Sequence, residues 1–118
     1  MAFGLKRAYD AAAGEDGRRV LVDRVWPRGV ARDELQIDAW LKDLAPSTEL
    51  RKWFAHDVTR WQEFKQRYFN ELAARPEAVR ELAAHASAGR VTLVFAAKDR
   101  EHNNAVALKE FLERRLRR

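Results

Sequence analysis

The sequence of 118 residues contains no cysteine, and it has only three prolines and five glycines. Without cysteine the protein can form no disulfide, no thiolate metal site and no cysteine nucleophile. Few glycines and prolines, together with 47% hydrophobic and 35% charged residues, are typical of a globular chain and not of a disordered one. A chain of this length builds one core, so we expect a single domain over residues 1–118.

Long apolar runs are also missing from the sequence. No run approaches the length of about 18 residues that spans a bilayer, and the amino-terminal segment MAFGLKRAYD lacks the apolar core of a signal peptide. We therefore expect a cytoplasmic protein without a membrane partner.

Motifs of metal and cofactor sites are absent as well. The three histidines, His56, His85 and His102, show neither HxxxH nor HExxH spacing, so we expect no metal site. No glycine-rich phosphate or dinucleotide motif and no GxSxG motif occurs. The sequence therefore disfavours nucleoside triphosphate hydrolysis and α/β-hydrolase chemistry, and it predicts no cofactor.

Positive charge is present in excess but is unevenly distributed. The net charge is +5, and four of the 23 basic residues form a carboxyl-terminal tail, Arg114, Arg115, Arg117 and Arg118. The rest of the chain is nearly neutral. Basic residues at a helix carboxyl terminus complement the helix macrodipole, and we favour this interpretation over contact with nucleic-acid phosphates.

Three segments have the pattern of strands, namely residues 3–9, 19–25 and 91–97. The last of these, VTLVFAA, has no charge over seven residues, begins with β-branched side chains and is too short for a buried helix. We expect it to be the central strand.

Apolar residues at helical spacing predict helices over residues 34–44, 48–54, 58–74 and 76–88, and a last helix that begins near Asp99. The expected caps are Ser47 or Thr48, Asp57, Asp99 and, at the end of the fourth helix, Gly89. Trp40 and Trp61 are expected on the core faces of their helices.

The order of these elements predicts an α/β fold. Apolar strands separated by a helical stretch of about 60 residues require a crossover connection and are therefore parallel. We expect a small, mostly parallel sheet of two to four strands, covered by about five helices. Ligands of such sheets bind beyond the carboxyl ends of the strands.

Polar clusters follow two of the expected strands, and we expect these clusters to meet in space. Arg24, Arg28, Arg51 and Lys98 are the candidates for binding a phosphate or carboxylate group. Asp23 and His102 are the catalytic candidates for proton transfer. The other candidate ligand-binding residues are Trp26, Asp99, Asn103 and Asn104. The alternative is that Arg24 or Arg28 pairs with a carboxylate of the protein and only ties loops together.

Four segments of the chain resemble the YeaO-like family of bacterial proteins, within the domain-of-unknown-function 488 group. They are LVDRVWPRG, WLKDLAPSTELRKWFAHD, WQEFKQRY and VTLVFAAKDREHNNAVALKEFL. The resemblance implies a compact α/β domain of uncharacterised biochemical function. Other branches of the group have cysteines near the end of the last strand, where this chain has Ala96 and Ala97, so no thiol chemistry is implied here.

These observations leave three functions open. The first is binding of a small anion beyond the strand ends, with or without catalysis. The second is a nucleic-acid accessory module, in which Trp26 stacks on bases and the basic tail holds phosphates. The third is an interaction protein whose polar clusters only fix the loops. We also consider that Trp26 packs against Arg24 by a cation–π contact.

Overall fold

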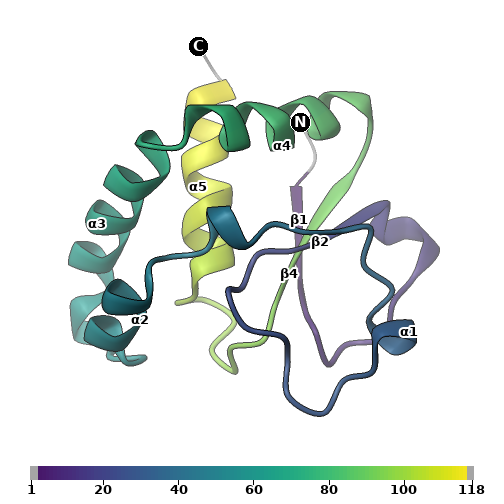
Figure 1. Ribbon diagram of the computed structural model, residues 1–118, viewed down its shortest axis with the longest axis horizontal. Coiled ribbons are helices and arrows are strands. Elements are labelled where there is room, and N and C mark those ends of the chain that lie inside the picture. The colour runs from purple at the N-terminus through teal and green to yellow at the C-terminus, as the bar shows by residue number, and fades with distance from the viewer. Residues whose placement is uncertain (1–2, 117–118) are drawn as a thin grey trace.

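The computed structural model describes residues 3–116. Over this range the chain forms one four-stranded sheet in the order β1-β4-β2-β3, and every neighbouring pair is parallel (Figure 1). The strands are β1 (Phe3–Arg7), β2 (Arg18–Leu21), β3 (Ala39–Trp40) and β4 (Val91–Phe95). The α/β architecture expected from the order of the elements is confirmed.

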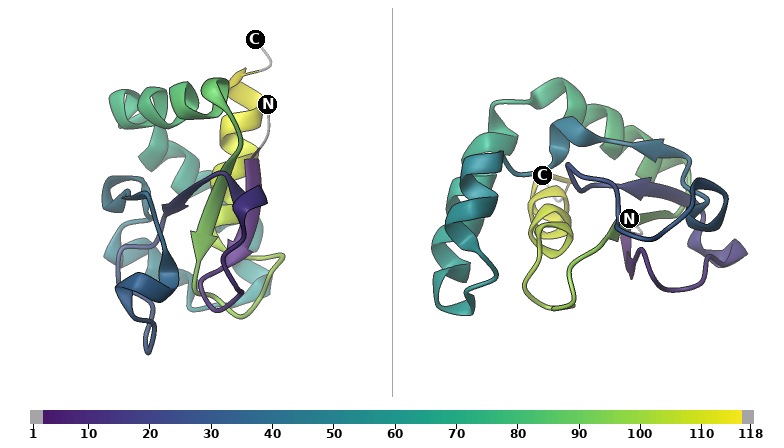
Figure 2. Two further views of the ribbon diagram at one scale, coloured as in Figure 1. Left: turned by 90° about the vertical axis from the view of Figure 1, so that its right-hand side faces the viewer. Right: turned by 60° about the horizontal axis from the view of Figure 1, so that its bottom comes forward.

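Five α-helices and three short 3₁₀ helices accompany the strands in the described chain. The α-helices are α1 (Arg32–Leu35), α2 (Thr48–Phe54), α3 (Trp61–Ala73), α4 (Pro76–Ala88) and α5 (Asn104–Leu116). The 3₁₀ helices are η1 (Gly14–Asp16), η2 (Lys42–Leu44) and η3 (Val58–Arg60). Figure 2 shows α3 and α5 lying to one side of the sheet, and α1 beyond its other side.

The central strand β4 is buried on both faces, which explains its uninterrupted apolar sequence. Its residues Leu93 and Phe95 belong to the main core beneath the long helices. Val94 points to the opposite face, where it packs with Leu21 and Leu35 in a second, smaller core. Two layers of cover therefore enclose the sheet, as the fold class requires.

Several predicted helix ends are confirmed. The Ser47 hydroxyl accepts a hydrogen bond from the Leu50 backbone N–H at 3.1 Å and caps α2. Asp57 caps η3, which leads directly into α3. Pro76 begins α4, and Gly89 follows its last residue. Local sequence signals of this kind act over one turn and need no tertiary context.

The helix predicted over residues 34–44 is wrong. The chain leaves α1 at Gln36, which has a left-handed conformation (φ 50°). It then becomes extended, so that Trp40 in β3 pairs with Leu21 in β2. Trp40 is therefore a partly exposed strand residue and not part of a helix face. The Trp40 indole N–H donates to the Asp23 carbonyl oxygen at 2.7 Å, and this contact with the segment after β2, together with the pairing of β3 and β2, outweighs the local helical spacing.

The predicted cap of the last helix is also wrong. Asn103, and not Asp99, caps α5: its side-chain oxygen accepts a hydrogen bond from the Val106 backbone N–H at 3.0 Å. Asp99 instead accepts hydrogen bonds from the N–H groups of Glu101 and His102, and so it closes a turn before the helix. The strands also end earlier than predicted, at Arg7, Leu21 and Phe95.

Candidate functional site

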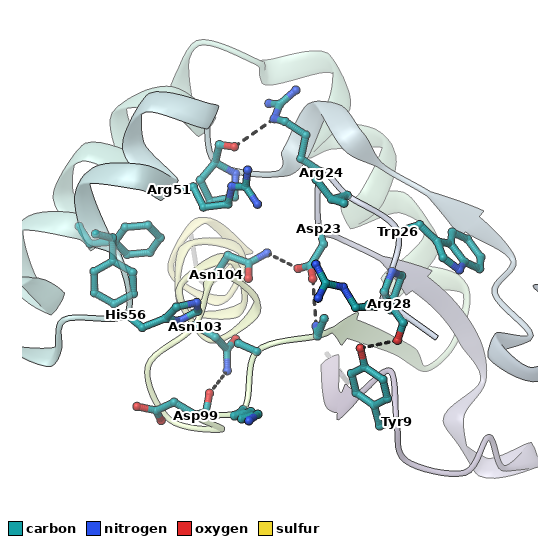
Figure 3. A pocket seen from close by; sticks show the side chains of 18 residues that line it. Tyr9, Asp23, Arg24, Trp26, Arg28, Arg51, His56, Asp99, Asn103 and Asn104 are labelled. Carbon is teal, nitrogen blue, oxygen red and sulfur yellow. Dashed lines mark hydrogen bonds between the residues drawn. The ribbon is translucent and has the colours of Figure 1, made fainter. Parts of the chain in front are cut away.

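A pocket of about 700 Å³ lies beyond the carboxyl ends of β1, β2 and β4 (Figure 3). Because β2 and β4 pair directly, with Leu21 beside Val94, the segments that follow them lie side by side. The helices α2 and α5 contribute further residues to the wall. Nine of the ten candidate site residues line this pocket: Asp23, Arg24, Trp26, Arg28, Arg51, Lys98, Asp99, Asn103 and Asn104.

Asp23 connects three elements at the base of the pocket. One of its carboxylate oxygens accepts a hydrogen bond from the Ala96 backbone N–H at 2.9 Å, and the other accepts from the Asn104 side-chain amide at 3.0 Å. Burial raises the pKa of Asp23, while the two hydrogen bonds and the nearby charge of Arg51 oppose this effect. The carboxyl group thus joins the ends of β2, β4 and α5.

The four candidate cations differ in their partners. Arg24 donates to the backbone carbonyl oxygens of Pro46 at 3.2 Å and Ala45 at 3.4 Å, and so it fixes the loop before α2. Arg28, Arg51 and Lys98 are exposed and form no ion pair with any described residue. The expected alternative, that Arg24 or Arg28 pairs with a carboxylate, is therefore not found among the described residues, although Arg24 does tie a loop in place through backbone carbonyl oxygens.

The formal charge of the pocket is positive, because four cationic side chains and two carboxylates line it. The first turn of α5 adds backbone N–H groups at the same place, held by Asn103 and Asn104. Asn103 is only 2% exposed, and its amide donates to the Asp99 carbonyl oxygen. Asn104 donates to the Val22 carbonyl oxygen and to Asp23. A helix amino terminus beside unpaired cations favours negatively charged groups.

His102 does not line the pocket. Its ring Nδ1 lies 3.0 Å from an Asp99 carboxylate oxygen, and its ring packs edge-on against Trp61 with centroids 5.4 Å apart. Hydrogen bonds, first of all from the Glu101 backbone N–H, lower the pKa of Asp99. The His102 ring is thus held by Asp99 and Trp61 within the protein.

Trp26 contributes to the outer wall of the pocket, but its ring is largely occupied. The indole N–H donates to the Val30 carbonyl oxygen at 2.7 Å, and Trp40 packs against it in a T-shaped contact at 5.4 Å. The cation over the Trp26 ring is Arg32, at 5.0 Å, and not Arg24 as we considered. In Figure 3 Trp26 lies on the far side of Asp23 from Arg51 and His56.

Two pocket residues with polar side chain groups, Tyr9 and His56, were not among the expected ligand-binding residues. Tyr9 follows β1, and its hydroxyl donates to the Arg28 carbonyl oxygen at 2.9 Å. Tyr9 was expected to lie inside the strand over residues 3–9, but β1 ends at Arg7, so Tyr9 belongs to the segment that follows the strand. His56 enters the pocket from the end of α2 through a left-handed backbone conformation (φ 58°), for which the sequence carries no clear signal.

The basic tail is only partly described, since Arg117 and Arg118 lie outside the described residues. Arg114 forms an ion pair with Glu110 at 3.2 Å on the next turn of α5 and covers the Phe69 ring. Arg115 covers the Phe111 ring at 5.4 Å. These two arginines thus pack on their own helix and its neighbour.

No helix within residues 3–116 has both the length and the apolar character needed to cross a membrane.

Comparison with known proteins gives relatives of the same length but no described activity. The chain is 42% identical over 107 residues to the uncharacterized protein YeaO of Escherichia coli, with 91% of this chain and 93% of YeaO covered. It is 39% identical over 109 residues to the uncharacterized proteins Mb3100c of Mycobacterium bovis and Rv3073c of Mycobacterium tuberculosis, with 92% of each chain covered. No solved structure gives a significant match.

One protein-family model matches nearly the whole chain, over residues 2–118, and it describes an inactive subclade. Together with the identity to YeaO, this match confirms the resemblance seen in the sequence motifs. The chain therefore belongs to the YeaO-like proteins of the DUF488 family, in the group described as the inactive DUF488-N3 subclade (DUF488-N3i).

Proposed function

We propose that the protein binds a small molecule bearing a phosphate or carboxylate group, in the pocket beyond the carboxyl ends of β2 and β4. The observation that carries this proposal is the lack of ion-pair partners for Arg28, Arg51 and Lys98. All three line one pocket, and none has a carboxylate partner among the described residues. Like charges gathered in one cavity repel each other, and an anionic ligand relieves that repulsion.

The proposed activity is binding without turnover. Both oxygens of Asp23 already accept hydrogen bonds, and the ring of His102 is held by Asp99 and Trp61 outside the pocket. Neither group is therefore well placed to transfer a proton to a ligand. The description of the family as an inactive subclade points in the same direction. At the cytoplasmic location we expect, phosphorylated and carboxylated metabolites would supply the ligand.

The nucleic-acid alternative has less support. A base would have to stack on Trp26, but the Trp26 ring already contacts Trp40 and Arg32. Phosphates would have to displace Arg114 and Arg115 from the aromatic rings that these side chains cover.

The test is anion titration of Arg51→Gln beside the matched control Lys52→Gln. Both changes remove one positive charge from α2, but Lys52 does not line the pocket. We expect Arg51→Gln to weaken binding of phosphate or acetate by about tenfold, because a charge-assisted hydrogen bond is lost. Lys52→Gln should bind as the unmodified protein does. Calorimetry or amide chemical shifts would measure both affinities. Equal losses in the two variants, or no anion binding by the unmodified protein, would overturn the proposal.

A further inference from the structure

We infer that the ligand is an organic anion with an apolar body about the size of an aromatic ring, and not an inorganic ion. This inference rests on the proposed function and names the class of ligand. Its starting point is the pocket volume of about 700 Å³. Cavities of about 300–1,000 Å³ enclose organic ligands, which make a few polar contacts and bury most of their surface against apolar walls. A single phosphate or acetate ion would leave most of this pocket unfilled.

The distribution of exposed apolar side chains supports an apolar body. Over the described chain, three large apolar side chains are exposed, namely Tyr9 (48%), Val25 (55%) and Val58 (49%). Two of them, Tyr9 and Val25, line the same pocket as the unpaired cations. Single exposed apolar residues are common, but their gathering at a cavity marks a binding surface.

The inner wall of the pocket is aromatic. Phe54 and Phe64 both line it, with their rings stacked and centroids 4.4 Å apart. They are 6% and 2% exposed, so this wall is part of the main hydrophobic core. Arg51 precedes Phe54 by about one turn of α2 and lines the pocket beside it.

Apolar and cationic surfaces therefore share one cavity. In Figure 3 Arg51 and His56 lie on one side of Asp23, and Arg28 and Tyr9 lie on the other. A ligand that fits both kinds of surface has its charged group among Arg28, Arg51 and the first turn of α5. Its apolar part then contacts Val25, Tyr9 and the phenylalanine wall, and loses water on binding.

The experiment compares each simple anion with its phenyl counterpart. The probes are inorganic phosphate against phenyl phosphate, and acetate against benzoate, titrated into the full chain. Burial of a ring strengthens binding, so we expect at least one phenyl compound to bind about tenfold or more tightly than its partner. Val25→Asn should reduce that ratio by about threefold or more. Val58→Asn is the matched control, since it is the same change at a similarly exposed valine outside the pocket.

The outcomes separate this inference from the proposed function. Equal affinities for the simple and phenyl anions would overturn the inference and leave anion binding intact. An equal effect of Val25→Asn and Val58→Asn would also overturn it. Arg51→Gln should weaken both members of a pair alike, because it removes the charge and not the apolar wall. If no probe binds, the proposed function is wrong, and the inference is overturned with it.

Discussion

At the scale of single residues, the end of α2 departs from ordinary backbone geometry. Ala55 and His56 are consecutive non-glycine residues with positive φ angles, 47° and 58°. The left-handed region costs an L-residue roughly 1–2 kcal/mol, and such outliers persist where the surrounding structure or a function requires them. Here the second residue of the pair lines the pocket, while the first does not.

This difference leads to a prediction for two glycine substitutions. We expect Ala55→Gly and His56→Gly each to raise the free energy of unfolding by about 0.5–1 kcal/mol, because glycine adopts positive φ without a steric penalty. Only His56→Gly should weaken anion binding. Urea unfolding and anion titration of the same samples measure the two effects. If both variants bind anions as tightly as the unmodified protein, His56 has no part in the site.

Asp10 and Asp23 show how the surroundings of a carboxyl group set its pKa. The Arg100 side chain, which forms two hydrogen bonds of 2.9 Å with Asp10, lowers the pKa of Asp10 to about 2. Burial raises the pKa of Asp23. The two carboxyl groups therefore make stability depend on pH in opposite directions. The stability contributed by Asp10 is lost as pH falls toward 2, whereas the stability contributed by Asp23 is lost as pH rises through its raised pKa.

At the scale of elements, α5 connects stability to the site. Its cap, Asn103, is almost fully buried and holds both the first turn of the helix and the loop at Asp99. The next residue, Asn104, reaches across to the ends of β2 and to Asp23. The amino terminus of α5 is thereby placed at the pocket by two adjacent amides.

We therefore expect Asn103→Ala to lower the free energy of unfolding by about 1–2 kcal/mol, since the Val106 N–H loses its capping oxygen. Anion affinity should fall as well, because the first turn of α5 is no longer held in place. Asn103→Ser retains a capping oxygen and should recover part of the stability. Thermal unfolding and anion titration measure both quantities. An alanine variant with unchanged stability would show that the cap is not needed.

At the scale of the whole molecule, the buried cations and the pocket cations differ in whether a carboxylate pairs with them. Near the amino end of β2, Arg19 is 4% exposed and pairs with the buried Asp16 at 2.6 Å, and Lys6 shares the same carboxylate at 3.0 Å. At the carboxyl ends of the strands, Arg28 and Lys98 have no such partner among the described residues.

This contrast predicts that one charge removal lowers stability strongly and that another hardly changes it. Asp16→Asn should destabilise the protein by about 3 kcal/mol or more, because it leaves the buried cation of Arg19 without its counter-charge. Arg28→Gln should change the free energy of unfolding by less than about 0.5 kcal/mol in either direction. Urea unfolding at neutral pH compares the two. A large loss of stability in Arg28→Gln would mean that this arginine serves the fold and not a ligand.

Much of the architecture follows from the sequence alone. The uncharged run of β4 requires burial on both faces, and the helix-end signals at Ser47, Pro76 and Gly89 act within one helical turn. These signals are local, so no tertiary information is needed to read them. The adjacency of the segments after β2 and β4 also follows, because parallel strands joined by crossovers end on the same side of a sheet. The order β1-β4-β2-β3 does not follow from the sequence, and β3 lies where a helix was expected.

Only the tertiary structure decided how the polar residues pair. Asp23 with Asn104, Trp40 with the Asp23 carbonyl oxygen, and Arg32 over Trp26 join residues whose relative positions depend on loops without a regular pattern. Helical spacing wrongly favoured residues 34–44, because a strand contact at Trp40 overrides a weak local preference. The sequence shows which residues carry a charge but not which of them form ion pairs, because pairing depends on distances that only the folded chain sets.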